Sequence, residues 1–295
     1  MHSACLVLLA LLSEPGTSAD LLRWKLAEGE SYRIEVRVQS QSAATVNKLV
    51  KKVASHQELR LSWQVEGTDA EGNFRIVQRI ERLRWRLEGE GGRVVIDYDS
   101  DAPPADEQAR RASAAVAALV GKSLRVVLSP RGEIISAVPD ADFQEALREL
   151  EDKENLLYLF SAEGLSAMLA QAMPILPEQA VVPGDKWQLS RRLALAFAPA
   201  TQKSEYVVIE PSDADRQAGL LPIDVTSQVE LEPAEGVSLK ITEQHTEGRL
   251  IFDVVHGRYL SARFKQLLVT ETPFRDDVAR ARVETAMELT VQPVK

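Results

Sequence analysis

Cysteine is almost absent from this sequence: Cys5 is the only one in 295 residues. It lies inside an N-terminal segment that we expect to be removed, so the mature chain would contain no cysteine. Such a chain can form neither a disulfide nor a thiol-based site. A chain of this length can bury a sufficient core without a disulfide or a metal, and its hydrophobic fraction of 45% is ordinary for a globular protein.

The chain also lacks an excess of basic residues. It has 35 Lys and Arg against 44 Asp and Glu, which gives a formal net charge of −9. Nucleic-acid binding needs a concentrated basic surface that displaces counterions, so the composition argues against a nucleic-acid partner. The overall charge also counts, less strongly, against docking on anionic lipid headgroups.

Long apolar runs are missing except at the N-terminus. Residues 4–12 read ACLVLLALL, which is too short to span a bilayer, and Pro15 and Gly16 follow. The small residues Thr17, Ser18 and Ala19 then resemble a signal peptidase site, although Met1 to Ser3 include no Lys or Arg. We predict cleavage after Ala19 and a secreted or periplasmic chain that does not span a membrane.

Alternating apolar and polar residues predict many antiparallel strands. In residues 31–39, for example, Tyr32, Ile34, Val36 and Val38 share one face. The phase shifts by one near Glu81, which predicts a β-bulge there. The other strands are expected around 59–65, 74–80, 83–87, 94–96, 124–128, 133–138, 187–197, 204–209, 221–231, 237–244, 249–255, 258–270 and 278–291.

Two segments depart from the strand pattern. Residues 101–121 are rich in alanine, which favours a helix. Residues 139–175 show helical spacing from Asp140 onward and end at Pro174, and the segment LPEQAVVPGDKW (176–187) then returns the chain to strands. We therefore expect a signal peptide (1–19), a β-rich half with one helix (20–138), a helical insert (139–175) and a second β-rich half (176–295) that continues the same domain.

The predicted fold class is α+β, mainly β. We expect one or more long curved antiparallel sheets, or an open barrel, with the helical insert packed on the sheet.

No motif for catalysis, a metal or a cofactor is present. There is no G-x-S-x-G elbow, and His56, His245 and His256 show no metal-ligand spacing. The glycine-rich residues 89–92 lead into a strand instead of a helix, and the acidic residues 97–101 lack the glycine and glutamate of a calcium loop. Arg82, Arg84 and Arg86 are expected to pair with acids across the sheet. We expect no cofactor and no catalytic residue.

The helical insert is unusually apolar. One interpretation is that it covers the open face of a curved sheet and forms core; the other is that it covers a cavity for a lipid or another hydrophobic small molecule. The residues that would line such a cavity are Leu156, Leu157, Phe160, Leu165, Met168, Leu169 and Met173.

Three segments carry a family resemblance: LLRWKLAEGESYRIEV (21–36), VVLSPRGEIISAV (126–138) and LPEQAVVPGDKW (176–187). They resemble an uncharacterised bacterial family of secreted β-rich proteins, a domain of unknown function, over nearly the whole mature chain. The resemblance implies export and no particular chemistry. The order of elements is also similar to that of the periplasmic lipoprotein carriers, whose open barrels hold acyl chains under helical lids.

Three functions therefore stay open at this point. The first is an exported non-enzymatic protein that binds a hydrophobic or lipid-like ligand between sheet and helices. The second is a structural or interaction module of the cell envelope, with protein partners that the sequence does not identify. The third is a hydrolase whose site converges from distant strands.

The N-terminal segment gives the first testable prediction. Expression of the full chain in a bacterium with a Sec pathway should yield a mature protein whose first residue is Asp20, because signal peptidase selects small residues such as those at 17–19. Intact mass and N-terminal sequencing of the exported protein test this. A protein that retains Met1, or stays in the cytoplasm, would contradict it.

Overall fold

The computed structural model describes residues 19–104, 110, 113–114, 117–148, 173–194, 199–232, 238–274 and 277–294. About two thirds of them belong to one antiparallel sheet of twelve strands. The strands are β1 (Ser31–Val46), β2 (Leu49–Thr68), β3 (Phe74–Glu88), β4 (Val94–Asp99), β5 (Ser123–Leu128), β6 (Ile134–Pro139), β7 (Lys186–Ala194), β8 (Pro199–Val208), β9 (Leu220–Leu231), β10 (Lys240–Asp253), β11 (Arg258–Phe274) and β12 (Asp277–Val294). The helical elements that the structure describes over their whole length are η1 (Glu90–Gly92), α2 (Ala141–Arg148) and α5 (Asp213–Ala218).

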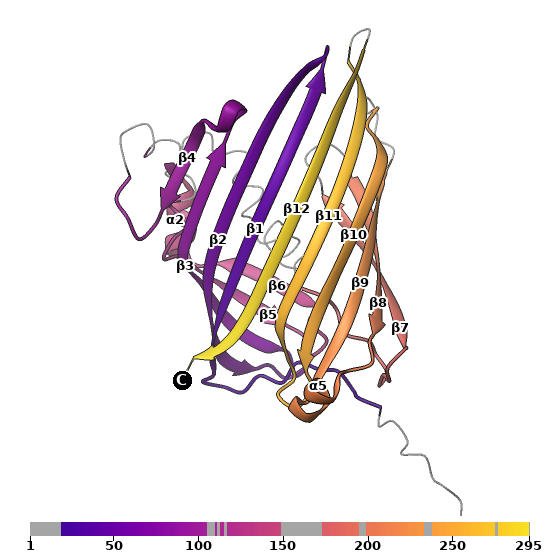
Figure 1. The fold of residues 1–295 in the computed structure, drawn as a ribbon. Coiled ribbons are helices and arrows are strands. Elements are labelled where there is room, and N and C mark those ends of the chain that lie inside the picture. Colours follow the sequence, from indigo (N-terminus) through magenta and orange to yellow (C-terminus); the bar gives the residue numbers. More distant parts are fainter. Residues whose placement is uncertain are drawn as a thin grey trace, which may run out of the picture.

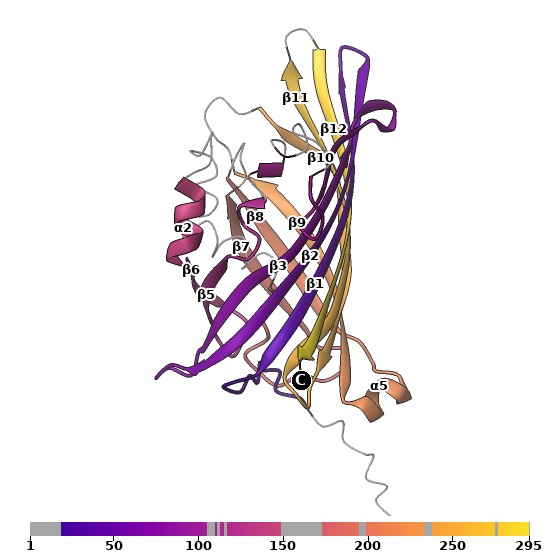
Figure 2. The ribbon, with the colours of Figure 1, turned by 90° about the vertical axis from the view of Figure 1, so that its left-hand side faces the viewer.

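The strand order is β6-β5-β3-β2-β1-β12-β11-β10-β9-β8-β7, and β4 pairs with β3. The first and last strands therefore meet at the centre of the sheet, and the order ends at β6 on one side and β7 on the other. The sheet curls so that β5, β6, β7 and β8 lie behind the central strands in Figure 1, and on the side away from β12 in Figure 2. The sheet is curved and not closed, which confirms the predicted mainly-β class.

Two ends of the sheet are distinguished below. The rim is the end that carries the β1–β2, β3–β4 and β11–β12 connections, at the top of Figure 1. The base is the opposite end, which carries the β2–β3, β5–β6 and β10–β11 turns and α5. In β1, residues near the base alternate between buried and exposed, whereas residues toward the rim are all at least partly exposed.

Several strands are longer than the sequence pattern predicts. β1 and β2 extend to a tight turn at Asn47 and Lys48, both of which have positive φ. The residues added, 40–56, are mostly Ser, Ala, Gln and Lys, so their apolar alternation is too weak to show a strand. The two strands expected at 237–244 and 249–255 are one continuous strand, β10, in which Gly248 lies beside Phe264 of β11.

The expected irregularity at Glu81 is present. The register between β2 and β3 shifts where Arg60 pairs with Arg82 and Leu61 pairs with Ile80, which leaves Glu81 as the extra residue. The bulge keeps apolar side chains on one face of β3 on both sides of the shift.

Two of the three arginines after the bulge, Arg82 and Arg86, pair as predicted with acids on the neighbouring strand. Arg82 donates to Asp99 with Nη2 at 2.6 Å, and Arg86 lies 3.1 Å from Asp97. The bonds from Arg82 are the main reason why the pKa of Asp99 lies below its ordinary value. This face of β3 and β4 is thus a partly solvated ladder of ion pairs.

The segment before β1 closes the base. Leu22, Trp24 and Leu26 are buried, so this stretch follows the period of two typical of a strand. The N–H of Trp24 donates to the carbonyl of Pro130 in the β5–β6 turn (2.7 Å), and the N–H of Lys25 donates to that of Gly257 in the β10–β11 turn (2.8 Å). The segment therefore ties together turns from the two halves of the sheet.

A second segment, residues 173–185, crosses the same end. The N–H of Leu176, which is fully buried, donates to the carbonyl of Arg131 (2.8 Å), and Val181 exchanges two hydrogen bonds with Asp20. The indole N–H of Trp187, at the start of β7, donates to the carbonyl of Ile175 (3.0 Å). These bonds link the β6 side of the sheet to the β7 side, although the two edge strands are not neighbours in the sheet.

Gly257 tests how much this closure contributes to stability. It has a φ of +61°, and an added Cβ would come within 2.5 Å of the Arg23 carbonyl oxygen. Gly257→Ala should lower the free energy of unfolding by roughly 3 kcal/mol, from strain and overpacking together. The control is Gly72→Ala, at φ +85° with nothing within 4 Å, which should cost only about 1 kcal/mol. Urea unfolding measures both variants. Equal losses of unfolding free energy in the two would contradict a stabilising role for the contact between Gly257 and the segment before β1.

Candidate ligand-binding face

The concave face of the sheet is apolar from the base to about half its length. Cross-strand pairing puts the inward side chains in rows, because residues that pair directly lie on the same face. In one such row Leu59, Val36 and Leu289 lie on the neighbouring strands β2, β1 and β12. In the next row toward the rim, Val38 of β1 pairs with Met287 of β12, which pairs with Phe264 of β11.

Burial of the inward side chains decreases from one row to the next toward the rim. Tyr32 and Ile34 near the base are buried, whereas Val36, Val38 and Met287 further along are only partly buried. The apolar face thus continues past the part of the core that the two base segments cover. Residues packed against the core without being fully buried include Val36, Leu59, Ile80, Phe264 and Leu289.

Aromatic rings fill the floor of the concave face. Trp24 lies edge-on to Tyr259, with ring centroids 5.6 Å apart, and Tyr259 lies edge-on to Phe252 at 5.1 Å. Trp24 also lies 6.0 Å from Trp63, whose indole N–H donates to the buried Gln78 amide oxygen at 2.7 Å. Contacts of this kind hold a rigid apolar surface in place.

Two polar atoms in this floor have no hydrogen-bond partner among the residues that the structure describes. They are the hydroxyl of Tyr259 and the indole nitrogen of Trp24, and both side chains are buried. Burial raises the pKa of Tyr259 well above its ordinary value, because the phenolate would be unsolvated there. Both groups can donate a hydrogen bond, so the floor includes two unused donors inside an apolar surface.

A cationic side chain lies nearby on β7. Burial lowers the pKa of Arg191, and the neighbouring hydroxyls of Tyr206 and Tyr259 partly offset this effect. Its guanidinium donates to the carbonyl of Met173 at 2.6 Å. Tyr206 itself stacks on Trp187, with ring centroids 5.0 Å apart and planes 8° apart.

The structure describes one of the seven cavity residues expected from the sequence. Met173 is partly buried and packs against the main core, beside β7. The other six lie outside the described residues: Leu156, Leu157, Phe160, Leu165, Met168 and Leu169. The prediction that they line a cavity therefore stays a prediction.

A buried carboxylate and a histidine at the base stabilise the β10–β11 turn. The buried Asp253 carboxylate accepts the backbone N–H of His256 (2.9 Å) and lies 2.7 Å from its Nδ1. Both groups belong to the β10–β11 connection, which Gly257 completes. Arg258 lies over the ring of Tyr32, 5.6 Å from its centroid. Among the described residues, no three His, Cys, Asp or Glu side chains could together hold a metal ion.

Two hollows elsewhere on the sheet are lined mainly by polar side chains. One of about 720 Å³ lies over β7 to β10 and includes Ser204, Ser227 and His245. Another of about 360 Å³ lies over β1, β2 and β10 to β12, and includes His56 and again His245. Neither has the apolar lining that a hydrophobic ligand needs. No helix in the described part of the chain is long and apolar enough to cross a membrane.

Two tyrosines provide a matched test of the polar atoms near the base. Tyr259→Phe removes a buried hydroxyl without a partner, so the free energy of unfolding of the ligand-free protein should stay within about 1 kcal/mol or rise. Tyr32→Phe removes a hydroxyl that donates to Glu30 at 2.6 Å and should cost about 1 kcal/mol. Urea unfolding measures both. A large loss in Tyr259→Phe would show that the hydroxyl has a partner.

The Tyr32 effect should depend on pH. Burial acts to raise the pKa of Glu30, but hydrogen bonds from the Ala27 N–H and the Tyr32 hydroxyl outweigh it, so the pKa is lowered. Burial, and then the same contact with Glu30, raises the pKa of Tyr32 to about 12. A carboxyl group whose pKa is lower in the folded state stabilises the fold at a pH above its unfolded-state pKa. This stabilisation is lost as the pH falls through its folded-state pKa. The cost of Tyr32→Phe should therefore shrink in acid.

Comparison with solved structures shows a related fold. A structure of lipovitellin, described as "Lipid-protein interactions in lipovitellin", is 10% identical and has a TM-score of 0.52; the match covers 90% of this chain. The chain spans about a quarter (25%) of the lipovitellin chain. At this identity the likeness concerns the fold alone.

Other matches are weaker. An outer membrane channel from Pseudomonas putida F1 is 8% identical, with 95% of this chain and 100% of that chain covered and a TM-score of 0.25. DynF of the dynemicin biosynthesis pathway of Micromonospora chersina is 8% identical over 94% and 91%, with a TM-score of 0.20. Scores this low establish no common fold.

No curated protein matches the chain. A family model matches residues 71–246, which include strands from both sides of the helical insert, and it is described as a family of unknown function. This confirms the expected relationship to an uncharacterised β-rich family. The chain belongs to the family of unknown function DUF6263.

Proposed function

We propose that the protein is a non-enzymatic binding protein that holds a hydrophobic, lipid-like molecule on the concave face of its open sheet. One observation carries the proposal: the apolar rows of this face continue beyond the buried core, so that Val36, Val38 and Met287 are only partly buried. A ligand with long apolar chains would remove the rest of this surface from water.

The shape of the sheet supports the same function. The base is closed by residues 19–30 and 173–185, while the described residues at the rim belong to strands and the connections between them. A sheet that is curled, closed at one end and apolar inside is suited to an elongated apolar guest that enters from the other end. The likeness in fold to lipovitellin, a protein described for its lipid–protein interactions, agrees with this function.

The floor of the concave face would add selectivity. Within the described part of the chain, the hydroxyl of Tyr259 and the indole N–H of Trp24 are donors without partners, and leaving such groups buried is unfavourable. A ligand that presents an oxygen acceptor at the floor would satisfy one of them. The proposal therefore favours a ligand with a polar end over a pure hydrocarbon.

The proposal includes export to the periplasm or the medium. Its support is the N-terminal sequence: the apolar residues 4–12 followed by the small residues 17–19. A carrier of apolar molecules in an aqueous compartment needs a concave apolar surface of this kind. A role as an interaction module of the envelope would instead leave the concave face empty.

Two adjacent positions on β1 test ligand binding. Val38 points inward, beside Met287, and Gln39 points outward and is exposed. Val38→Asp should reduce the amount of co-purifying lipid by about tenfold or more, because a carboxylate would be buried against an apolar ligand. Gln39→Asp introduces the same group on the same strand and should leave ligand content unchanged.

The measurement is native mass spectrometry of the protein purified without detergent, followed by solvent extraction and identification of the bound lipid. The proposal predicts a mass above that of the polypeptide, which denaturation removes. A wild-type protein that carries no ligand and takes up no added fatty acid would refute it. So would equal ligand content in the two variants, provided that both unfold at urea concentrations close to wild type.

A further inference from the structure

The tip of the β1–β2 hairpin exposes apolar side chains at the rim. Leu49, the first residue of β2, is 71% exposed, and Val50 and Val53 follow it. Further exposed apolar side chains at this end are Val94 and Val95 of β4 and Val278 of β12. Several such residues together on an exposed edge mark an interaction surface more often than single ones do.

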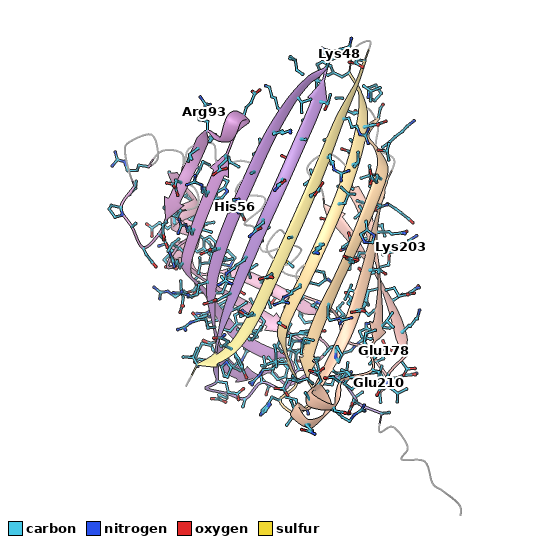
Figure 3. The ribbon with its side chains drawn as sticks, in the orientation of Figure 1. Lys48, His56, Arg93, Glu178, Lys203 and Glu210 are labelled. Atoms are coloured by element: carbon cyan, nitrogen blue, oxygen red, sulfur yellow. The ribbon has the colours of Figure 1, made fainter. Side chains whose placement is uncertain are left out.

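The same hairpin is basic. Lys48, Lys51 and Lys52 lie at its tip, and the sequence has no acidic residue between Glu35 and Glu58. None of the three lysines forms an ion pair with any residue that the structure describes. Figure 3 shows Lys48 and Arg93 at the rim, whereas Glu178 and Glu210 lie at the base.

Among the residues that the structure describes, the tip of the neighbouring β11–β12 hairpin adds two charges of each sign, Arg280 and Arg282 against Glu271 and Asp277. Arg280 of β12 pairs in register with Thr45 of β1 and lies 3.9 Å from Glu271, and Asp277 lies at the start of β12. The net excess at the rim therefore comes from the three hairpin lysines.

This local charge differs from that of the whole chain. The formal net charge of −9 opposes approach to an anionic surface. At physiological ionic strength, however, electrostatic fields decay over about 8 Å, so a surface that touches the rim senses mainly the groups of the hairpin tips. The acids at the base are too far away to cancel them.

We propose that the rim is a docking surface for an anionic lipid bilayer. Leu49 and Val50 enter the headgroup layer, and Lys48, Lys51 and Lys52 contact lipid phosphates. The combination of exposed apolar and unpaired basic side chains fits an interface in which apolar chains lie just beneath anionic groups. A second copy of the chain fits less well, because two rims would bring like charges together.

Docking depends on the rim side chains alone, whereas a role of the rim in loading a ligand rests on the proposed function. Docking through the rim turns the open end of the concave face toward the bilayer. A lipid then has only the polar rows nearer the rim, such as Ser40, Thr285 and Gln266, to pass between the bilayer and the apolar rows. The rim would thus determine where the ligand enters and leaves.

Vesicle flotation of the purified full chain tests the docking surface. The probes are vesicles of phosphatidylcholine alone and of phosphatidylcholine mixed with phosphatidylglycerol. Wild type should bind the mixed vesicles more tightly, and added salt should weaken this binding. Each lysine near an anionic surface contributes about a fivefold gain in affinity, so K48E/K51E/K52E should lose on the order of a hundredfold or more.

The apolar contribution has its own variant and control. Leu49→Asp should weaken binding to both kinds of vesicle about tenfold or more, because an apolar side chain leaves the interface and a negative charge enters it. Val255→Asp makes the same change at the opposite end, in the β10–β11 turn, where Val255 is 63% exposed. It should bind vesicles like wild type. Lys265→Glu, on the exposed side of β11, is the corresponding charge control.

Three outcomes would overturn the docking surface: no binding to mixed vesicles, equal loss in the rim and control variants, or a dimer in solution that Leu49→Asp dissociates without any vesicle binding. Because Leu49 is exposed, these changes should leave the unfolding curve unchanged, which circular dichroism checks. Failure of docking is distinct from failure of the proposed function. A rim variant that still carries lipid in native mass spectrometry refutes docking as the only route of loading and leaves ligand binding intact.

Discussion

The pairing of β1 with β12 is the contact on which the whole structure depends. It runs antiparallel along almost all of β1, from Ser31 opposite Val294 to Thr45 opposite Arg280. Without it the strands that precede the helical insert and those that follow it would form two separate sheets. Each separate sheet would expose one face of apolar side chains, and neither would enclose a concave surface.

The base segments complete what this pairing begins. The pairing joins the two halves at the centre of the sheet, and the residues before β1 and after the insert join their outer parts at one end through backbone hydrogen bonds. Their buried side chains, above all Trp24 and Leu176, fill the floor between the halves. The concave face is therefore deep at the base and open at the rim, and its polar donors lie where the floor is most buried.

Local sequence patterns predicted much of the sheet. A phase shift in the apolar pattern predicted the bulge at Glu81, and a turn with Pro and Gly predicted the β5–β6 hairpin. Asp140, as a capping residue, predicted the start of α2. The extension of β1 and β2 was missed because Ser, Ala and Lys give no apolar alternation. The helix α5 was also missed, although its Ser212 cap and Gly219 end are both visible in the sequence.

The candidate site was less accessible to such reasoning. Trp24, Tyr206 and Tyr259 lie far apart in the sequence and meet only because the sheet curls, so no local spacing relates them. A usable signal was the alternation of Leu22, Trp24 and Leu26, which shows that the chain before β1 already has a buried face. The rim hairpin carried a signal too, since its run of lysines without acids stands out in an acidic chain.

The two edge strands of the sheet have a mechanical consequence. In a closed cylinder of strands, the number of strands and their stagger set the internal diameter. Among the described strands, β6 and β7 end the sheet without pairing to each other. Beyond the base, where residues 173–185 link the two sides, no ladder of hydrogen bonds between these strands sets the gap. Small changes of twist, spread over many strands, can widen or narrow the interior at little cost. If the proposed function holds, ligands of different width can then share one scaffold.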